Sequence, residues 1–222
     1  IANDVHGKNH HGAGSVGHHI EAMELLRSDG SRHLLHAAER SPLFAATIGG
    51  LGLTGVITQA TIRMRRVPGP WLSQVTRRFE SLSEFFAVDG ELKATYEYTV
   101  AWIDCVAPPA KRGRGIYIAG NHHSTDLADP GPARATRVPF VPPFSLVGPL
   151  TLRAFNFAYY RRRLQSGPHT VHYRPFFYPL DAILDWNRIY GPGGLYQFQC
   201  AIPEAASCEV VGKLLDVIAK HA

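Results

Sequence analysis

The sequence predicts an α+β fold built in two parts. Residues 56–65 alternate apolar and polar side chains, which is the period-two pattern of a strand. Residues 68–70 read Pro-Gly-Pro and indicate a linker. Further strand patterns rich in aromatic residues follow, and an amphipathic helix comes last. We therefore expect two domains, 1–67 and 68–222, the second formed by an antiparallel sheet with helices on one side.

Two glycine-rich segments stand out in the first part. Residues 1–17 crowd seven polar or charged side chains into nine positions and contain four glycines. Residues 49–55 add four glycines in seven positions. Glycine allows the backbone to approach another group closely. A loop of this kind is suited to binding a cofactor or a metal.

Short regular elements are expected between these segments. The apolar runs 20–26 and 32–37 flank an Asp-Gly turn, which predicts a β-hairpin. A single helix is the alternative. Ser41 followed by Pro42 is a typical helix start, so residues 43–47 should form a short helix.

The second part begins with two strands and a helix. Residues 71–79 and 115–119 are predicted strands. Ser81 and Glu84 have the spacing of a capping box, which predicts a short helix through Phe86. A further strand carries an aromatic stripe, in which core packing is favoured over a ligand-binding wall. The stripe consists of Tyr96, Tyr98, Val100 and Trp102.

The remainder alternates irregular and regular segments. Residues 129–149 contain six prolines and little periodicity, so we expect an irregular excursion, a candidate lid. Residues 171–178 are predicted to form a strand. Residues 179–190 are predicted to form a helix, which ends at a Gly-Pro-Gly-Gly sequence. Residues 195–202 are another predicted strand, and the amphipathic helix begins after Pro203.

Two groups of polar residues in this remainder are candidates for binding. Gln197 and Gln199 share one face of an otherwise apolar strand, and buried glutamines need hydrogen-bond partners, which makes them pocket candidates. Residues 161–163 are three arginines. They form either a solvated basic face or a contact with lipid phosphate.

Composition excludes several classes of protein. The chain has 222 residues, 45% of them hydrophobic, and a net charge of +5. It contains no recognisable nucleic-acid-binding module, so an anionic small substrate or a membrane surface explains the charge better. No apolar run reaches the roughly 18 residues of a membrane span. Three cysteines without CxxC spacing suit a reducing, cytoplasmic compartment.

Metal and nucleophile motifs are not found. The twelve histidines show neither HExxH spacing nor a helical pair beside a carboxylate, so no metal site is expected. There is no GxSxG elbow and no cysteine in an activating setting. Residues 12–17 match G-x-G-x-x-G, but no helical pattern follows, and we interpret the match as chance.

A family resemblance rests on motifs along nearly the whole chain. Residues 1–17, IANDVHGKNHHGAGSVG, together with GGLGLTG at 49–55, resemble the second half of the FAD-binding domain of the vanillyl-alcohol-oxidase type of flavoproteins. The HGKNHH form is most similar to the decaprenylphosphoryl-β-D-ribose oxidase-like branch. WNRIYGP at 186–192 is a second specific match.

The resemblance implies a cofactor, a reaction and a set of site residues. The cofactor is FAD, and the protein would supply positive charge near the reduced flavin. The implied cofactor-lining residues are Asn3, Asp4, Val5, His6 and Ile57. The implied catalytic residues are His6, beside the flavin ring, and Lys8, reaching toward the substrate. The implied substrate-binding residues are Lys8, Trp102, Phe177, Gln197 and Gln199.

The same resemblance sets the expected architecture. Residues 1–67 would be the C-terminal part of a PCMH-type FAD-binding domain, and 68–222 a C-terminally truncated substrate domain, both incomplete. The family's pyrophosphate loop and its later cysteine- and lysine-bearing segments would lie outside this sequence. We therefore expect the isolated chain to bind FAD weakly or not at all and to be inactive.

The implied parent enzyme oxidises a secondary alcohol of a sugar or sugar-phosphate lipid by hydride transfer to FAD. Peripheral membrane contact, a partner reductase and a cytoplasmic location are further expectations, and nucleic acid is not an expected partner. The alternative is a non-catalytic protein that binds an anionic glycolipid or sugar, because basic runs and a proline-rich segment would serve it equally well. A histidine-rich metal site is the second alternative.

Overall fold

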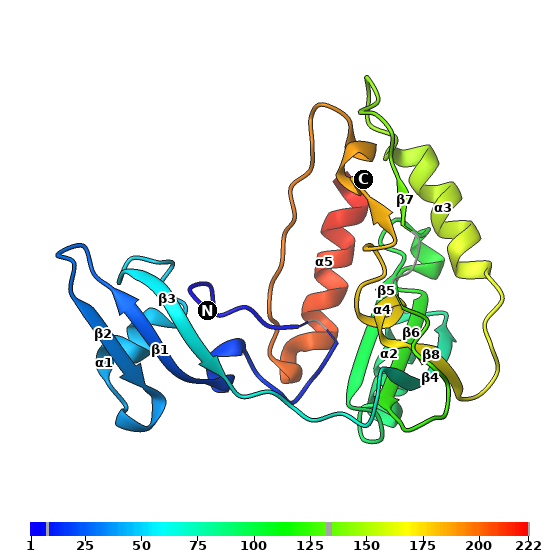
Figure 1. Cartoon of the computed structure of the whole chain (residues 1–222). Coiled ribbons are helices and arrows are strands. Elements are labelled where there is room, and N and C mark those ends of the chain that lie inside the picture. Colours follow the sequence, from blue (N-terminus) through cyan, green and yellow to red (C-terminus); the bar gives the residue numbers. More distant parts are fainter. Residues whose placement is uncertain (8, 132–134, 222) are drawn as a thin grey trace. The chain divides into compact units, whose positions relative to one another are not determined.

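The computed structural model describes residues 1–7, 9–131 and 135–221 and has the α+β composition expected (Figure 1). The chain divides into two compact units, Ile1–Val67 and Pro68–Ala222. This division falls at the Pro-Gly-Pro sequence.

Unit 1 is built on a three-stranded antiparallel sheet with strand order β2-β1-β3. The strands are β1 (Ile20–Leu26), β2 (Arg32–His36) and β3 (Val56–Ile62). The predicted hairpin is confirmed, with Gly30 at φ +81° in its turn. Glycine adopts this left-handed conformation without strain.

A small apolar core holds unit 1 together. Met23 and Leu25 of β1 are 1% and 0% exposed. Phe44 of α1 (Pro42–Thr47) packs into the same cluster. The helix begins after Ser41 as predicted, although the Ser41 side chain makes no capping hydrogen bond. Short 3-10 turns lie at η1 (Val16–His19) and η2 (Ala37–Glu39).

Unit 2 is built on a four-stranded antiparallel sheet with strand order β5-β6-β4-β8. The strands are β4 (Trp71–Phe79), β5 (Tyr98–Ile103), β6 (Gly115–His122) and β8 (His169–His172). The first three confirm predicted strands. A separate two-stranded ladder pairs β7 (Thr136–Arg137) in parallel with β9 (Ile183–Leu184).

Helix α2 (Leu82–Leu92) covers one face of this sheet. The Ser81 half of the capping box is confirmed, because the Glu84 N–H donates to Ser81 Oγ at 3.2 Å. The Glu84 carboxylate does not complete the box, because its Oε2 accepts from the N–H of Glu80 at 2.7 Å rather than from that of Ser81. The helix is longer than predicted. Phe79 and Tyr117, 0% and 1% exposed, form the core beneath it, and α5 (Ser207–His221) packs beside it.

The opposite face also carries helices, so the prediction of helices on one side is wrong. Tyr98 and Trp102 lie on the face away from α2, because neighbouring Ala101 and Ile103 pack against the α2 side and side chains alternate along a strand. Phe177 of α4 (Tyr173–Phe177) contacts Tyr98. Tyr159 of α3 (Pro149–Arg161) contacts Trp102, and this helix was not predicted.

The predicted strand 171–178 is wrong beyond its first residues. β8 ends at His172, and α4 follows it. Pro175 lies inside the predicted strand. A proline has no N–H to give to a sheet ladder but is tolerated in the first turn of a helix, which accounts for the change.

The predicted helix 179–190 is also wrong. This segment forms β9 and the 3-10 turn η4 (Trp186–Tyr190) instead. Asp185 between them has φ 56°, in the left-handed region, which interrupts a right-handed helix. Residues 129–149 are irregular as expected apart from β7, leaving aside 132–134, which lie outside the described residues.

The predicted strand 195–202 does not form. These residues run without helix or strand, seen in orange in Figure 1, and no described strand pairs with them. Tyr196 and Phe198 are 103% and 83% exposed. A strand needs a ladder partner for its backbone groups, and an alternating pattern alone does not supply one. The final helix is confirmed as α5, preceded by η5 (Glu204–Ala206).

Candidate functional site

The two glycine-rich segments of unit 1 lie side by side. The Gly49 N–H donates to Ile1 O at 3.2 Å, and the Leu51 N–H donates to Ala2 O at 2.8 Å. The Val16 N–H closes the loop by donating to Val5 O at 2.9 Å. Backbone bonds therefore join two segments that are more than thirty residues apart, and residues 1–17 are held as a defined loop.

Asp4 is the side chain that fixes this loop. Its Oδ2 accepts from Ser15 Oγ at 2.7 Å, and its Oδ1 accepts from the Gly17 N–H at 2.8 Å. These two bonds, that of Ser15 first, lower the pKa of Asp4 below its usual value. Both carboxylate oxygens accept hydrogen bonds from residues of the same loop, so Asp4 holds the start of the loop against its end.

Gly17 is needed because there is no room for a side chain beside Asp4. A Cβ at this position would lie 2.9 Å from Asp4 Oδ1 and 2.6 Å from Ile48 Cγ2. Contacts below 3.0 Å require the neighbours to move, and both are fixed by packing or hydrogen bonds. The sequence pattern of the loop thus has a direct steric reason.

A hollow of about 300 Å³ opens at this loop, lined by His6, His10, His11, Gly14 and Ser15. The His6 Nδ1 lies 3.1 Å from Gly7 O, a hydrogen-bonding distance. Burial, followed by the charges of His6 and His11, lowers the pKa of His10. Lys8, predicted to be catalytic, lies outside the described residues.

The other predicted cofactor-lining residues lie in different surroundings. Asn3 and Val5 are exposed on the loop. Ile57 of β3 is half-buried and packs against the apolar core of unit 1. Asn3, Asp4, Val5 and His6 thus lie on one loop. Ile57 lies in the sheet, where it packs against the core of unit 1.

Two of the predicted substrate-binding residues share one face of the unit 2 sheet. Phe177 lies 4.9 Å from Tyr98 between ring centroids, and Trp102 lies 4.8 Å from Tyr159. Tyr98 and Trp102 are four residues apart on β5, about 13 Å along a strand. Trp102 and Phe177 therefore occupy opposite ends of β5 without touching through their rings.

Gln197 and Gln199 are both exposed, in the segment that forms no strand. Because that strand is not formed, the two side chains do not share a strand face, and their place in a substrate pocket stays a prediction.

Sequence reasoning did not single out His122. Its ring lies 5.6 Å from that of Tyr98 and 6.1 Å from that of Phe177, and its Nδ1 lies 2.9 Å from Gly69 O. The one available signal was a histidine pair directly after a predicted strand. Whether His122 lies on the same sheet face as Phe177 depends on how the strands pair, and the local sequence does not determine that pairing.

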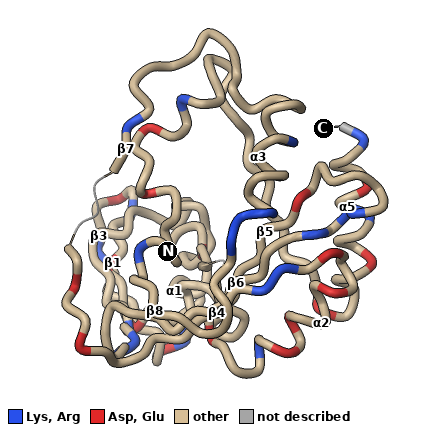
Figure 2. Tube along the Cα trace, turned by 90° about the vertical axis from the view of Figure 1, so that its right-hand side faces the viewer, with Lys and Arg blue, Asp and Glu red and all other residues tan. Residues whose placement is uncertain are grey.

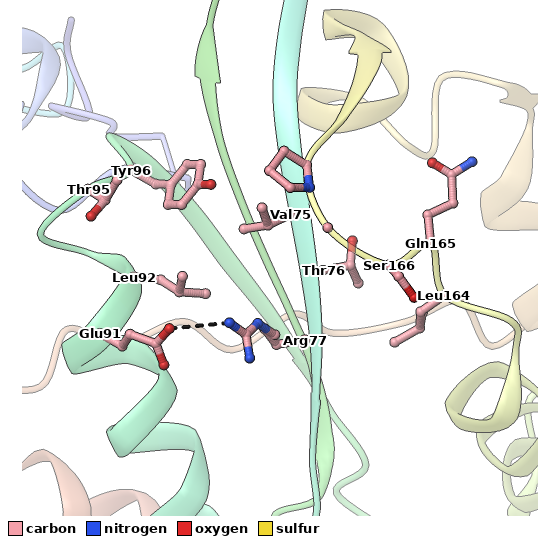
Figure 3. A pocket seen from close by; sticks show the side chains of 12 residues that line it. Val75, Thr76, Arg77, Glu91, Leu92, Thr95, Tyr96, Leu164, Gln165 and Ser166 are labelled. Atoms are coloured by element: carbon pink, nitrogen blue, oxygen red, sulfur yellow. Dashed lines mark hydrogen bonds and ion pairs between the residues drawn. The ribbon is translucent and has the colours of Figure 1, made fainter.

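A different hollow in unit 2 is lined by none of the predicted catalytic, cofactor-binding or substrate-binding residues. It has a volume of about 610 Å³ and lies between α2, β4 and residues 164–168 (Figure 3). Arg77 Nη2 and Glu91 Oε1 form an ion pair across it at 3.2 Å, and both side chains are more than half exposed. An exposed pair of this kind contributes little to stability or binding.

Among the residues described, no group of three or more histidine, cysteine, aspartate or glutamate side chains could hold a metal ion. Within the same residues, every helix is too short or too polar to cross a bilayer.

The chain is similar to two known bacterial proteins. Over 230 aligned residues it is 35% identical to the decaprenylphosphoryl-beta-D-ribose oxidase of Mycolicibacterium smegmatis, a match that covers 98% of this chain and 50% of the oxidase. The chain is a homologue of part of that oxidase. It is also 38% identical over 141 residues to an uncharacterized protein in the mprA 5'region of Streptomyces coelicolor, covering 63% of this chain and 36% of that protein. No family model matches the sequence.

This homology agrees with the motif resemblance. The chain spans about half the length of the oxidase and about a third of the Streptomyces protein. What the whole oxidase does can therefore be brought to this chain only as a proposal. The roles of the individual site residues stay predictions.

Proposed function

We propose that this chain is part of an FAD-dependent oxidoreductase that oxidises a secondary alcohol of a sugar or sugar-phosphate lipid. The observation that carries the proposal is the 35% identity to a ribose oxidase along 98% of the chain. The loop motif HGKNHH supports the flavin part of the proposal, because the resemblance to flavoproteins rests on it.

The described residues of the loop fit a flavin. A flavin needs a fixed backbone wall with an open side, and the bonds from Gly49, Leu51 and Val16 fix this wall. His6 is exposed on the open side and borders the hollow. FAD, when bound, supplies an acceptor for the hydride of the alcohol carbon. Asn3, Val5 and His6 would hold it, and Asp4 would keep them in place.

The protein's own contribution is position and charge. His6 would lie near the reduced flavin, where positive charge is favourable. Burial, followed by the charges of His6 and His11, lowers the pKa of His10, which disfavours a further positive charge beside His6. Lys8 is proposed to reach the substrate. Unit 2 would contribute Trp102 and Phe177 to the substrate wall, and its sheet would form the substrate domain.

The surroundings of the reaction are also proposed. The substrate would be a lipid-linked or small sugar, a partner reductase or another acceptor would reoxidise the flavin, and the protein would work in the cytoplasm with peripheral membrane contact. Nucleic acid is not a proposed partner. The sugar substrate rests on the oxidase's name, and the membrane contact rests on the chain's basic residues.

A flavin titration of the full-length gene product tests the proposal. We expect FAD to bind and its absorbance to bleach when a polyprenyl-phosphate pentose is added without oxygen. His6→Ala should slow bleaching by about 10²-fold if His6 stabilises the reduced flavin. His33→Ala, an exposed histidine of the hairpin, is the matched control and should leave the rate unchanged.

Two results would count against the enzyme. A full-length product that binds no flavin would exclude flavin chemistry. Flavin binding without bleaching by any sugar alcohol would favour the alternative, a non-catalytic protein that binds an anionic glycolipid or sugar. The basic residues of unit 2 are the observation that keeps this alternative in view.

A further inference from the structure

Two basic runs that are far apart in the sequence meet in unit 2. Lys111 and Arg114 lie just before β6, and Arg153 and Arg161 lie on α3. All four line one hollow of about 590 Å³, between α3 and residues 104–111. The lysines and arginines along the trace are blue in Figure 2. The sequence separates these residues by up to fifty positions, and only the fold brings them together.

One of the four cations is already neutralised. Arg114 donates to Asp104 Oδ2 from Nε at 3.0 Å and from Nη2 at 2.8 Å. Asn156 Nδ2 donates to Asp104 Oδ1 at 2.7 Å. Asp104 is 1% exposed. A buried carboxylate needs such partners, so this network serves to anchor α3 on the sheet and fixes the floor of the hollow.

The other three cations have no acidic partner in the part of the chain that the structure describes. No ion pair or hydrogen bond to a carboxylate involves Lys111, Arg153 or Arg161 there. Neighbouring Arg112, by contrast, is paired with Asp216. Three cations around one hollow repel each other, and a bound anion removes that repulsion.

The arrangement favours phosphate over a carboxylate. Guanidinium groups donate two parallel hydrogen bonds to phosphate oxygens, and phosphate has enough oxygens for several donors at once. The Arg161 guanidinium lies 4.2 Å above the Phe157 ring, a cation–π contact that limits its orientations. A group held in this way loses less entropy when it binds.

We propose that the hollow between α3 and residues 104–111 binds the phosphate group of a ligand through Lys111, Arg153 and Arg161. The site lies wholly within unit 2 and its binding needs no flavin, so it can be present whether or not the proposed oxidoreductase function holds. Lipid headgroups and soluble phosphate esters share this group. Leu150 and Phe155 of α3, 80% and 57% exposed, give a lipid chain an apolar surface on the same helix.

Calorimetric titration of the 222-residue chain with inorganic phosphate is the first arm of the test. Sedimentation with phosphatidylcholine vesicles, with and without phosphatidic acid, is the second arm. The variant Arg153→Gln/Arg161→Gln removes two cations at exposed positions. We expect its dissociation constant for phosphate to rise at least about tenfold, because each charge-assisted hydrogen bond is strong.

The control removes the same charge elsewhere. Arg163→Gln/Arg66→Gln takes one arginine from the same basic run and one from unit 1, and neither lines the hollow. Its dissociation constant should change by less than about twofold. Equal melting temperatures of the variants would show that both fold.

Each outcome decides the proposal. A selective loss of phosphate binding in Arg153→Gln/Arg161→Gln supports a soluble phosphate ester. A selective loss of binding to vesicles containing phosphatidic acid, with no binding of inorganic phosphate, supports a lipid headgroup. Equal weakening in both double variants, or binding of neither probe, overturns the site. Because no arm contains flavin, these results do not depend on the oxidoreductase proposal.

Discussion

Asp4 shows how one side chain can hold a glycine-rich loop in place. Its carboxylate bonds both Ser15 and Gly17, more than ten residues away in the sequence. Its own φ is 42°, a left-handed conformation that aspartate and asparagine tolerate better than most residues. An aspartate at this position therefore supplies the carboxylate that accepts the two hydrogen bonds and also tolerates the left-handed backbone conformation.

We predict that Asp4→Asn destabilises unit 1 by about 1–3 kcal/mol at neutral pH, because the hydrogen bonds from Ser15 and Gly17 lose the negative charge that strengthens them. The folded pKa of Asp4 is lowered from 3.8, so its contribution is present above pH 3.8 and is lost as pH falls through the lower folded value. The difference in melting temperature from the wild type should therefore shrink in acid.

The Asp4 prediction has two controls. Asp126→Asn, at an exposed position in unit 2, should leave the melting temperature unchanged at every pH. Ser15→Ala should cause part of the same loss and add little to Asp4→Asn, since the two residues share one bond. A pH-independent effect of Asp4→Asn would show that the carboxylate charge is not what matters.

At the scale of elements, two serines at helix starts look alike in sequence but differ in structure. Ser81 Oγ accepts from the Glu84 N–H at 3.2 Å. Ser41 also precedes a helix, with Pro42 next, yet its side chain makes no capping bond. The proline carries the start of that helix, because its φ is already helical.

We predict that Ser81→Ala costs about 1 kcal/mol of unfolding free energy, the usual value of a lost N-cap. Ser41→Ala should cost clearly less, since no capping bond is lost with it. Urea denaturation of the two single variants measures both values. Equal losses would mean that the Ser81 bond does not contribute to stability.

Elements were predicted well where their signals are local. The hairpin turn, the capping box and the period-two strands depend on neighbouring residues, and β1 to β6, α1, α2 and α5 formed where those patterns lie. The secondary structure predicted for residues 171–202 is wrong in large part because the sequence patterns there are ambiguous. Pro175 and the left-handed Asp185 break the regular elements, and the alternating segment 195–202 has no described strand to pair with.

The whole molecule has one apolar core in each unit. Met23 belongs to the first core and Phe79 to the second, and the two clusters share no residue. Cooperative unfolding follows buried contacts, so separate cores should open separately.

We predict that Met23→Ala and Phe79→Ala act on different units. Each should cost about 2–5 kcal/mol through the cavity it leaves. Hydrogen exchange measured amide by amide should accelerate in β1 and β2 for Met23→Ala, and in β4 and β6 for Phe79→Ala. Acceleration of both units by either variant would show that they unfold as one.

The candidate site divides along the same line. The loop residues Asn3, Asp4, Val5 and His6 were grouped by a local motif, and they do lie on one loop. Trp102 and Phe177 were grouped by resemblance, and the sheet puts them on one face at opposite ends of β5. Their roles toward a flavin or a sugar stay predictions.

The sequence by itself determined the α+β class, the linker at residues 68–70, the glycine-rich loop and the relationship to a ribose oxidase, since periodicity, turn residues and motifs are properties of neighbouring residues. Only the tertiary structure decided that Asp4 binds within its own loop, that helices cover both faces of the sheet, and that Lys111, Arg153 and Arg161 surround one hollow. These features depend on which distant segments pack together, and that choice is made by burial and pairing across the whole chain.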